Sequence, residues 1–172
     1  MGVLFDYFRA PDASVAATVA DLPAGPLVPD DDGRAPFDGV DAKGVMPDVV
    51  LAQLVAIVRG VPYDDEILTT ATVWPPPDTA PASQEEYEDL PDDSPWLTGP
   101  WVEALDDGTR DTLAGIEEDR TAEYAARWAE IEEFSTAGVP PRDDLLPLVA
   151  ELRGLAGRAR DAGERLYCWS SL

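Results

Sequence analysis

The sequence predicts one α+β domain, rich in helix, in which a small sheet is formed by strands at the two ends of the chain. Three observations favour this fold class. The chain has 172 residues, of which 45% are hydrophobic, enough to bury the core of one domain. Short apolar segments with aromatic residues lie at both ends, and longer segments between them repeat apolar residues at helical spacing. We therefore expect residues 1–172 to form a single domain.

The terminal segments are expected to be strands. VLFDYF, near the start, is rich in aromatic and apolar residues and ends before Pro11, and RLYCWSS, near the end, has the same character. We expect the two to pair with each other, because the ends of compact domains often lie close together. A third strand is predicted over Thr69 to Trp74, where Thr and Val residues precede a run of prolines.

The most clearly marked helix is predicted over residues 47–59. Pro47 suits a first helical turn, and Gly60 suits a left-handed C-terminal cap. A second amphipathic helix is predicted over residues 144–162, where Asp144 would be the N-cap and leucine and alanine residues form one apolar stripe.

Two further helices are expected. A short one over Val15 to Ala20 would be capped by Asp12 or Ser14. A longer one is predicted over residues 111–134, because apolar and aromatic residues recur there at near-helical spacing. Gly115 is an alternative point at which this segment would divide in two. The apolar faces of the helices at 47–59, 111–134 and 144–162 are expected to pack on the sheet.

The negative charge of the chain is unevenly distributed. The net charge is −23, from 35 acidic and 12 basic residues. Thirteen of the acidic residues lie between Arg59 and Arg110, a stretch that contains no Lys or Arg and holds eight of the 17 prolines. Because proline lacks a backbone donor and fixes φ, long regular elements are not expected there. We therefore interpret residues 60–109 as an acidic, Pro-rich and partly irregular segment of the domain.

Composition disfavours several classes of function. The net charge opposes direct docking on nucleic acids or on anionic membranes and favours a basic protein partner. The absence of His removes the commonest catalytic base and metal ligand, and no Gly-rich phosphate loop is present, so we expect no cofactor or metal and lean against an enzyme. The single cysteine, Cys168, fits a reducing compartment, and the N-terminal segment has no basic region typical of a secretory signal. A cytoplasmic location is expected, and the sequence does not indicate an oligomeric state.

The candidate binding site lies in the sequence SQEEYEDLPDD and the tryptophans that follow it. Acidic side chains would steer a cationic partner, and aromatic side chains would supply contact area. The predicted function is therefore that of a non-catalytic acidic interaction protein that neutralises a basic partner, such as an immunity protein, an antitoxin-like inhibitor or a nucleic-acid mimic. The predicted binding residues are Glu85, Glu86, Tyr87, Glu88, Asp89, Asp92, Asp93, Trp96 and Trp101.

Two alternatives from other classes remain open. Carboxylates alone can hydrolyse glycosides or hold a divalent cation, so a His-free or metal-dependent enzyme is an alternative. Its candidate residues are Asp38, Asp41 and Lys43, or the acidic group from Glu130 to Glu133. The second alternative is a small-molecule binding domain with an aromatic pocket, whose expected lining residues are Trp96, Trp101 and Trp128.

Three segments carry a resemblance to other proteins. DYFRAPD and LYCWSS at the ends and GVMPDVVLAQLVAIVRGVPYDDE between them resemble a set of small uncharacterised bacterial proteins from high-GC genomes. The resemblance implies a shared fold. It implies no activity and no catalytic or binding residue.

Overall fold

The computed structural model describes residues 3–136 and 145–172 and confirms the α+β fold class. Within the described part of the chain, five antiparallel strands form one sheet in the order β2-β1-β5-β4-β3. The strands are β1 (Leu4–Ala10), β2 (Gly39–Asp41), β3 (Thr70–Trp74), β4 (Trp101–Leu105) and β5 (Arg165–Ser171).

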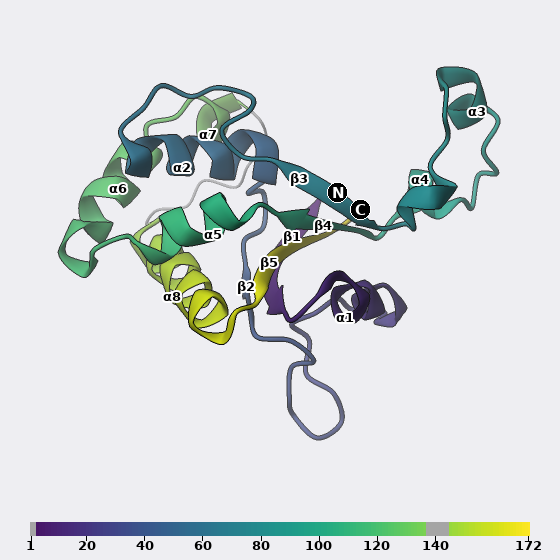
Figure 1. Ribbon diagram of the computed structural model, residues 1–172, viewed down its shortest axis with the longest axis horizontal. Helices are drawn as coiled ribbons and strands as arrows, with labels where there is room; N and C mark the ends of the chain where they lie inside the picture. Colours follow the sequence, from purple (N-terminus) through teal and green to yellow (C-terminus); the bar gives the residue numbers. More distant parts are fainter. Residues whose placement is uncertain (1–2, 137–144) are drawn as a thin grey trace.

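The predicted pairing of the two terminal strands is confirmed. β1 and β5 are neighbours inside the sheet, and their register places Leu4 opposite Ser171 and Ala10 opposite Arg165. The two ends of the chain consequently lie close together (Figure 1). The third predicted strand is also confirmed, as β3 at one edge of the sheet.

Two strands, β2 and β4, were not predicted from the sequence. β2 has only three residues, too few to show a pattern of alternation. β4 lies inside the segment 60–109, directly after Pro100, and pairs with both β3 and β5. That segment therefore contains one edge strand and one interior strand of the sheet in addition to short helices.

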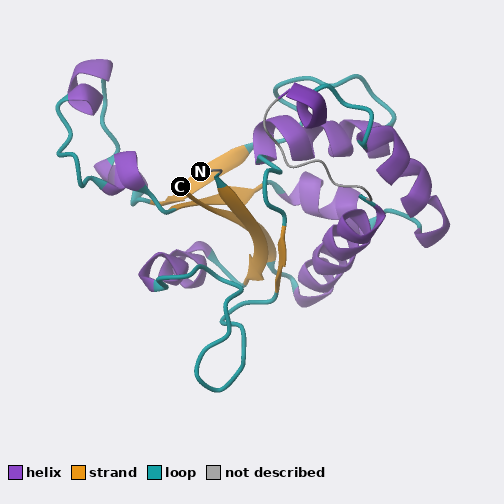
Figure 2. Ribbon diagram, turned by 180° about the vertical axis from the view of Figure 1, so that it is seen from behind, coloured by secondary structure: helices purple, strands orange, loops and turns teal. Residues whose placement is uncertain are grey.

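The helices lie mainly on one side of the sheet (Figure 2). The α-helices are α1 (Ala13–Ala17), α2 (Ala52–Arg59), α3 (Gln84–Glu88), α4 (Pro95–Thr98), α5 (Asp107–Ala114), α6 (Thr121–Trp128), α7 (Glu133–Thr136) and α8 (Leu146–Ala162). Shorter 3₁₀ segments are Thr18–Asp21, Pro77–Thr79 and Glu118–Arg120, and a π-helical turn, Pro47–Leu51, leads into α2.

Local sequence signals explain the ends of these helices. The π-helical turn and α2 together cover the predicted helix 47–59, which ends at Gly60 with a φ of 69°, as a left-handed cap requires. Gly163 ends α8 in the same conformation. The predicted N-cap of that last helix, Asp144, lies outside the described residues. For the short first helix the structure selects Asp12, whose Oδ1 accepts a hydrogen bond from the amide of Val15.

The prediction of one continuous helix over residues 111–134 is wrong. α5 starts earlier, because Asp106 caps it by accepting a 2.8 Å hydrogen bond from the amide of Thr109, and it ends at Gly115. A 3₁₀ turn and α6 follow, and α6 ends at Trp128. Gly115 is thus the point of division, as the alternative reading of the sequence proposed.

The sheet separates two apolar cores. The larger core lies between the sheet and helices α2, α5, α6 and α8, with Trp128 fully buried at its centre and its indole Nε1 donating to the carbonyl of Val50 at 2.9 Å. The smaller core lies on the other face beneath α1, where the Phe8 ring stacks on Tyr167. Both faces of the sheet centre are therefore covered.

Candidate functional site

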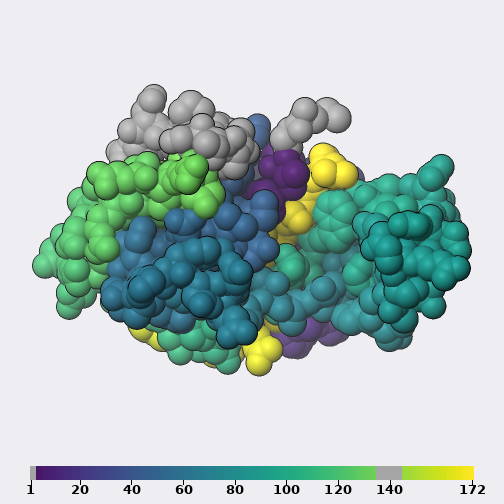
Figure 3. Space-filling view, turned by 90° about the horizontal axis from the view of Figure 1, so that it is seen from above, coloured from purple at the N-terminus to yellow at the C-terminus, as the bar shows by residue number. Residues whose placement is uncertain are grey.

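The feature that stands apart from both cores is a long connection between β3 and β4, residues 75–100, which we call the acidic arm. It projects from the edge of the sheet and carries α3 and α4 (Figure 1). In the space-filling view it forms the teal lobe at one end of the molecule (Figure 3). The peptide bonds Trp74–Pro75 and Gly99–Pro100, at its two ends, are cis.

Polar side chains within the acidic arm define its two short helices. Ser83 caps α3 by accepting a hydrogen bond from the amide of Glu86 at 3.2 Å, while the Glu86 carboxylate accepts one from the amide of Ala82 at 2.7 Å. This reciprocal arrangement resembles a capping box and satisfies donors at the start of the helix. Ser94 is the N-cap of α4, and Pro95 occupies its first turn.

The acidic arm contains seven carboxylates and no Lys or Arg, and every one of these carboxylates is exposed. Six of them are predicted binding residues: Glu85, Glu86, Glu88, Asp89, Asp92 and Asp93. Tyr87, in the same helix, leaves 41% of its surface exposed. Among the described residues no ion pair involves a carboxylate of the acidic arm.

Outside the acidic arm, ion pairs are common. Arginine side chains there form ion pairs with neighbouring carboxylates; these are Arg9, Arg110, Arg120, Arg127, Arg153, Arg158, Arg160 and Arg165. The acidic arm is therefore a region of uncompensated negative charge beside a body in which eight arginines are paired with acids.

The base of the acidic arm is fixed by Trp96. Its indole Nε1 donates to the hydroxyl of Thr79 at 3.1 Å, and that hydroxyl donates in turn to the carbonyl of Pro76 at 2.7 Å. These bonds join the outgoing and returning limbs of the arm. Trp101, the first residue of β4, packs its ring against Gly99, so closely that a Cβ at Gly99 would lie 2.8 Å from the ring. Gly99 also has a φ of 70°, which favours glycine.

Trp96 and Trp101 line one cavity, which we call the Trp groove. It has a volume of about 300 Å³ and lies on the helix-bearing face of the sheet, between the base of the arm and the π-helical turn before α2. Its other lining residues are Val3, Phe5, Met46, Pro47, Asp48, Thr72, Glu103 and Ser170. In Figure 3 the two ends of the chain, purple and yellow, lie between the blue helix and the teal arm.

The expectation that Trp128 shares this pocket is wrong. Trp128 is fully buried between α6, α8 and the π-helical turn, where its indole is hydrogen-bonded to Val50. Its ring belongs to the core because α6 packs on α2 and α8. The structure thus brings together two of the three expected lining residues, Trp96 and Trp101.

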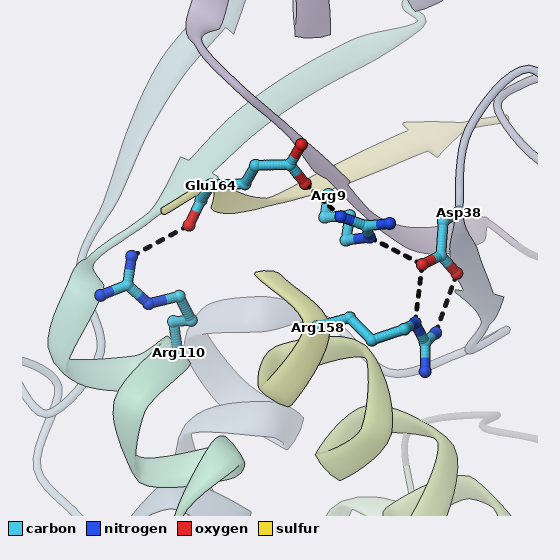
Figure 4. A network of polar contacts seen from close by, with 5 residues as sticks. All are labelled: Arg9, Asp38, Arg110, Arg158 and Glu164. Atoms are coloured by element: carbon cyan, nitrogen blue, oxygen red, sulfur yellow. Dashed lines mark hydrogen bonds and ion pairs between the residues drawn. The ribbon is translucent and has the colours of Figure 1, made fainter. Parts of the chain in front are cut away.

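Asp38, in the loop before β2, is held between two arginine side chains, Arg9 and Arg158 (Figure 4). Both oxygens of Asp38 accept hydrogen bonds from Arg158, at 2.7 and 2.8 Å, and one of them also accepts from Arg9 at 2.7 Å. The hydrogen bonds from Arg158, and then those from Arg9, lower the pKa of Asp38 to about 2. A carboxylate with so low a pKa is a poor general base at neutral pH, so Asp38 is better explained as an anchor.

This ion-pair network extends to the start of β5. Arg9 also donates to the Glu164 carboxylate at 2.6 Å, and Arg110 donates to the Glu164 carbonyl at 2.9 Å (Figure 4). It joins β1, the loop before β2, α5, α8 and the turn before β5. No local pattern in the sequence predicts this network, since Asp38 and Arg158 are 120 positions apart.

Two further groups bear on metal binding and catalysis: the acidic residues Glu130 to Glu133 and the thiol of Cys168. In the described ranges, 3–136 and 145–172, no group of three or more His, Cys, Asp or Glu side chains is placed to hold a metal ion, and this includes Glu130 to Glu133. Cys168 is buried in β5, and burial raises the pKa of its thiol well above the usual value. A buried thiol of high pKa is a weak nucleophile.

No family model, curated protein or solved structure matches this chain. In the part of the chain that the structure describes, none of the helices has the length and apolar character needed to cross a membrane. The site is therefore assigned from its geometry and charge alone.

Proposed function

We propose that this protein is a non-catalytic acidic interaction protein that binds a basic protein partner through the acidic arm. The observation that supports this most is the separation of charge: seven exposed carboxylates share one projecting segment without a cation, while eight arginines elsewhere are paired with acids. An immunity protein, an antitoxin-like inhibitor and a nucleic-acid mimic would all use such a surface.

Electrostatics supports this choice of partner. At physiological salt the Debye length is about 8 Å, so carboxylates on the same short helix still repel one another. A cationic surface that docks on the arm relieves this repulsion, whereas a nucleic acid or an anionic membrane adds to it. Complementary charge of this kind increases the rate of association and the dependence of binding on salt.

The aromatic residues of the arm supply the second part of an interface. Tyr87 is exposed among the carboxylates of α3, and Trp96 is only half-buried. Aromatic side chains surrounded by charges are typical of positions that contribute strongly to binding. The proposal includes a cytoplasmic location, because the single cysteine fits a reducing compartment.

The test compares two variants that change the net charge by the same amount. The arm variant carries Glu85→Gln, Glu86→Gln, Glu88→Gln and Asp89→Asn. The control variant carries Asp31→Asn, Glu66→Gln, Glu117→Gln and Glu130→Gln, which replace exposed acids outside the arm. Isothermal titration calorimetry with an octa-arginine peptide at about 20 mM NaCl measures both against the unmodified chain.

The arm variant is expected to bind the peptide about tenfold more weakly than the unmodified chain, and the control variant within about twofold of it, because close charges dominate. Equal weakening in the two variants would mean that only net charge matters, and the arm would then have no special role.

A further inference from the structure

The Trp groove combines two features that differ from the rest of the acidic surface. Its walls are aromatic and aliphatic, from Trp96, Trp101 and Met46, whereas α3 of the acidic arm exposes mainly carboxylates. It also contains two carboxylates, those of Asp48 and Glu103, and none of its lining residues is Lys or Arg. An apolar slot with carboxylates and no internal cation is complementary to a side chain that has an apolar stem and a cationic end.

Glu103 is positioned for such a cation. It lies in β4, half-buried, and its Oε1 accepts a hydrogen bond from the hydroxyl of Thr70 at 2.9 Å across the strand pair. Among the described residues no ion pair involves Glu103, so its charge is not compensated within this part of the chain. A carboxylate held by one neutral donor retains the capacity to accept further hydrogen bonds.

The dimensions of the Trp groove limit its occupant. A volume of about 300 Å³ is at the lower end of the range for ligand pockets, about 300–1,000 Å³, and suits one long side chain better than a cofactor. The groove is also continuous with the acidic arm, because Trp96 belongs to both. A partner that docks on the arm would therefore bring its own surface side chains to the mouth of the groove.

We propose that the Trp groove receives one arginine side chain of the basic partner. A guanidinium stacks on tryptophan faces and donates in a planar fork to a carboxylate, which a lysine ammonium cannot match. The methylene stem of the arginine would contact Met46 and Pro47, while Glu103 or Asp48 accepts from its guanidinium. This proposal takes the basic character of the partner from the proposed function, but the groove itself is tested with a single residue.

The experiment uses the full chain and Nα-acetyl-arginine amide as the probe. Two-dimensional NMR of the indole N–H groups reports on the five tryptophans separately, each assigned by its Trp→Phe variant. The signals of Trp96 and Trp101 are expected to shift with millimolar probe, while those of the buried Trp128 and Trp169 stay in place. Nα-acetyl-citrulline amide, which has a similar shape but no charge, is expected to bind about fivefold more weakly or worse, and the lysine analogue to lie between the two.

Two variants test the walls of the groove without removing its tryptophans. Glu103→Gln is expected to weaken the probe about fivefold, because it removes the charge of the acceptor and keeps its shape. Met46→Lys places an ammonium at the mouth of the groove and is expected to abolish binding. Met46 is 41% exposed, so the fold should tolerate this change. Val28→Lys, at a residue that is 51% exposed and does not line the groove, is the matched control and should leave binding unchanged.

The outcomes separate this inference from the proposed function. Equal binding of the arginine and citrulline probes, no shift of Trp96 or Trp101, or no effect of Glu103→Gln would overturn the assignment of the groove. The arm variant is expected to keep the affinity for the single-residue probe within about twofold while losing affinity for octa-arginine. If the arm and control variants bind octa-arginine equally well but the single-residue probe still shifts the indole signals of Trp96 and Trp101, the proposed function fails and the groove remains a guanidinium site.

Discussion

Two buried tyrosines on opposite faces of the sheet provide a matched test of the structure. Tyr7 in β1 is 1% exposed, and its hydroxyl donates a 2.7 Å hydrogen bond to the carbonyl of Val45. Tyr167 in β5 is 0% exposed, and its hydroxyl has no hydrogen-bond partner among the described residues. Replacing each by phenylalanine removes one oxygen atom from a buried position, but only Tyr7→Phe leaves an acceptor behind.

The structure fixes the expected size of each effect. Tyr7→Phe loses a buried hydrogen bond and leaves the Val45 carbonyl unpaired, which should lower the free energy of unfolding by about 2 kcal/mol. For a chain of this length that corresponds to a decrease in Tm of roughly 4–8 °C. Tyr167→Phe removes a desolvated hydroxyl without a partner and should be neutral or raise the free energy of unfolding by up to about 1 kcal/mol.

Urea unfolding, followed by circular dichroism and tryptophan fluorescence, measures both variants against the unmodified chain. The two probes should give coincident transitions, as a single cooperative domain requires. A loss of stability in Tyr167→Phe equal to that in Tyr7→Phe would refute the reasoning, because it would mean that the Tyr167 hydroxyl has a partner and that the packing described for the smaller core is incorrect.

Three further predictions concern single side chains. Burial, and then the like negative charge of Asp41, raise the pKa of Asp6 from 3.8 to about 6. After allowance for solvent screening, Asp6→Asn should add about 1 kcal/mol to the free energy of unfolding at pH 8. Urea titrations should show this gain disappearing as the pH falls from about 6 to 4, and a gain that stays constant would contradict the prediction. Hydrogen bonds from Arg158 and Arg9 lower the pKa of Asp38 to about 2. Asp38→Asn should therefore lower the free energy of unfolding by about 1 kcal/mol at pH 7, and this difference from the unmodified chain should be lost between about pH 4 and 2. An unchanged difference at pH 2 would contradict the network. Gly99→Ala should lower the free energy of unfolding by about 1–3 kcal/mol and shift the NMR signal of the Trp101 indole N–H. Gly60→Ala, at a similar φ but with open space around it, is the control and should leave that signal in place. The same Trp101 signal in both variants would argue against the close contact at Gly99.

The sequence predicted those parts of the fold that have local signals. The two terminal strands are recognisable because each concentrates aromatic and apolar residues, and α2 is recognisable from Pro47 and Gly60. β4 lacked such a signal, since five residues that follow a proline in an acidic stretch resemble a loop. Its strand conformation depends on pairing with β5, which is more than 60 positions away, and only the assembled sheet provides that partner.

The sequence predicts the charged part of the candidate site but not its cavity. Charge is visible in the sequence, so the carboxylates of the acidic arm can be predicted as a group from the sequence alone. Which tryptophans are core and which line a cavity depends on packing: Trp128 is buried where α6 packs on α2 and α8, whereas Trp96 and Trp101 line the Trp groove. The placement of Asp48 and Glu103 in the Trp groove could not be predicted either, because they reach it from separate elements.

The rate constant of association is the decisive measurement of whether the acidic arm captures a basic partner. Stopped-flow mixing of the chain with a fluorescent octa-arginine peptide measures it at about 20 mM and at about 300 mM NaCl, on either side of the screening range. The arm variant is expected to associate about tenfold more slowly than the control variant at low salt, and the two rate constants are expected to converge at high salt. Equal rate constants for the arm and control variants at low salt would contradict the claim.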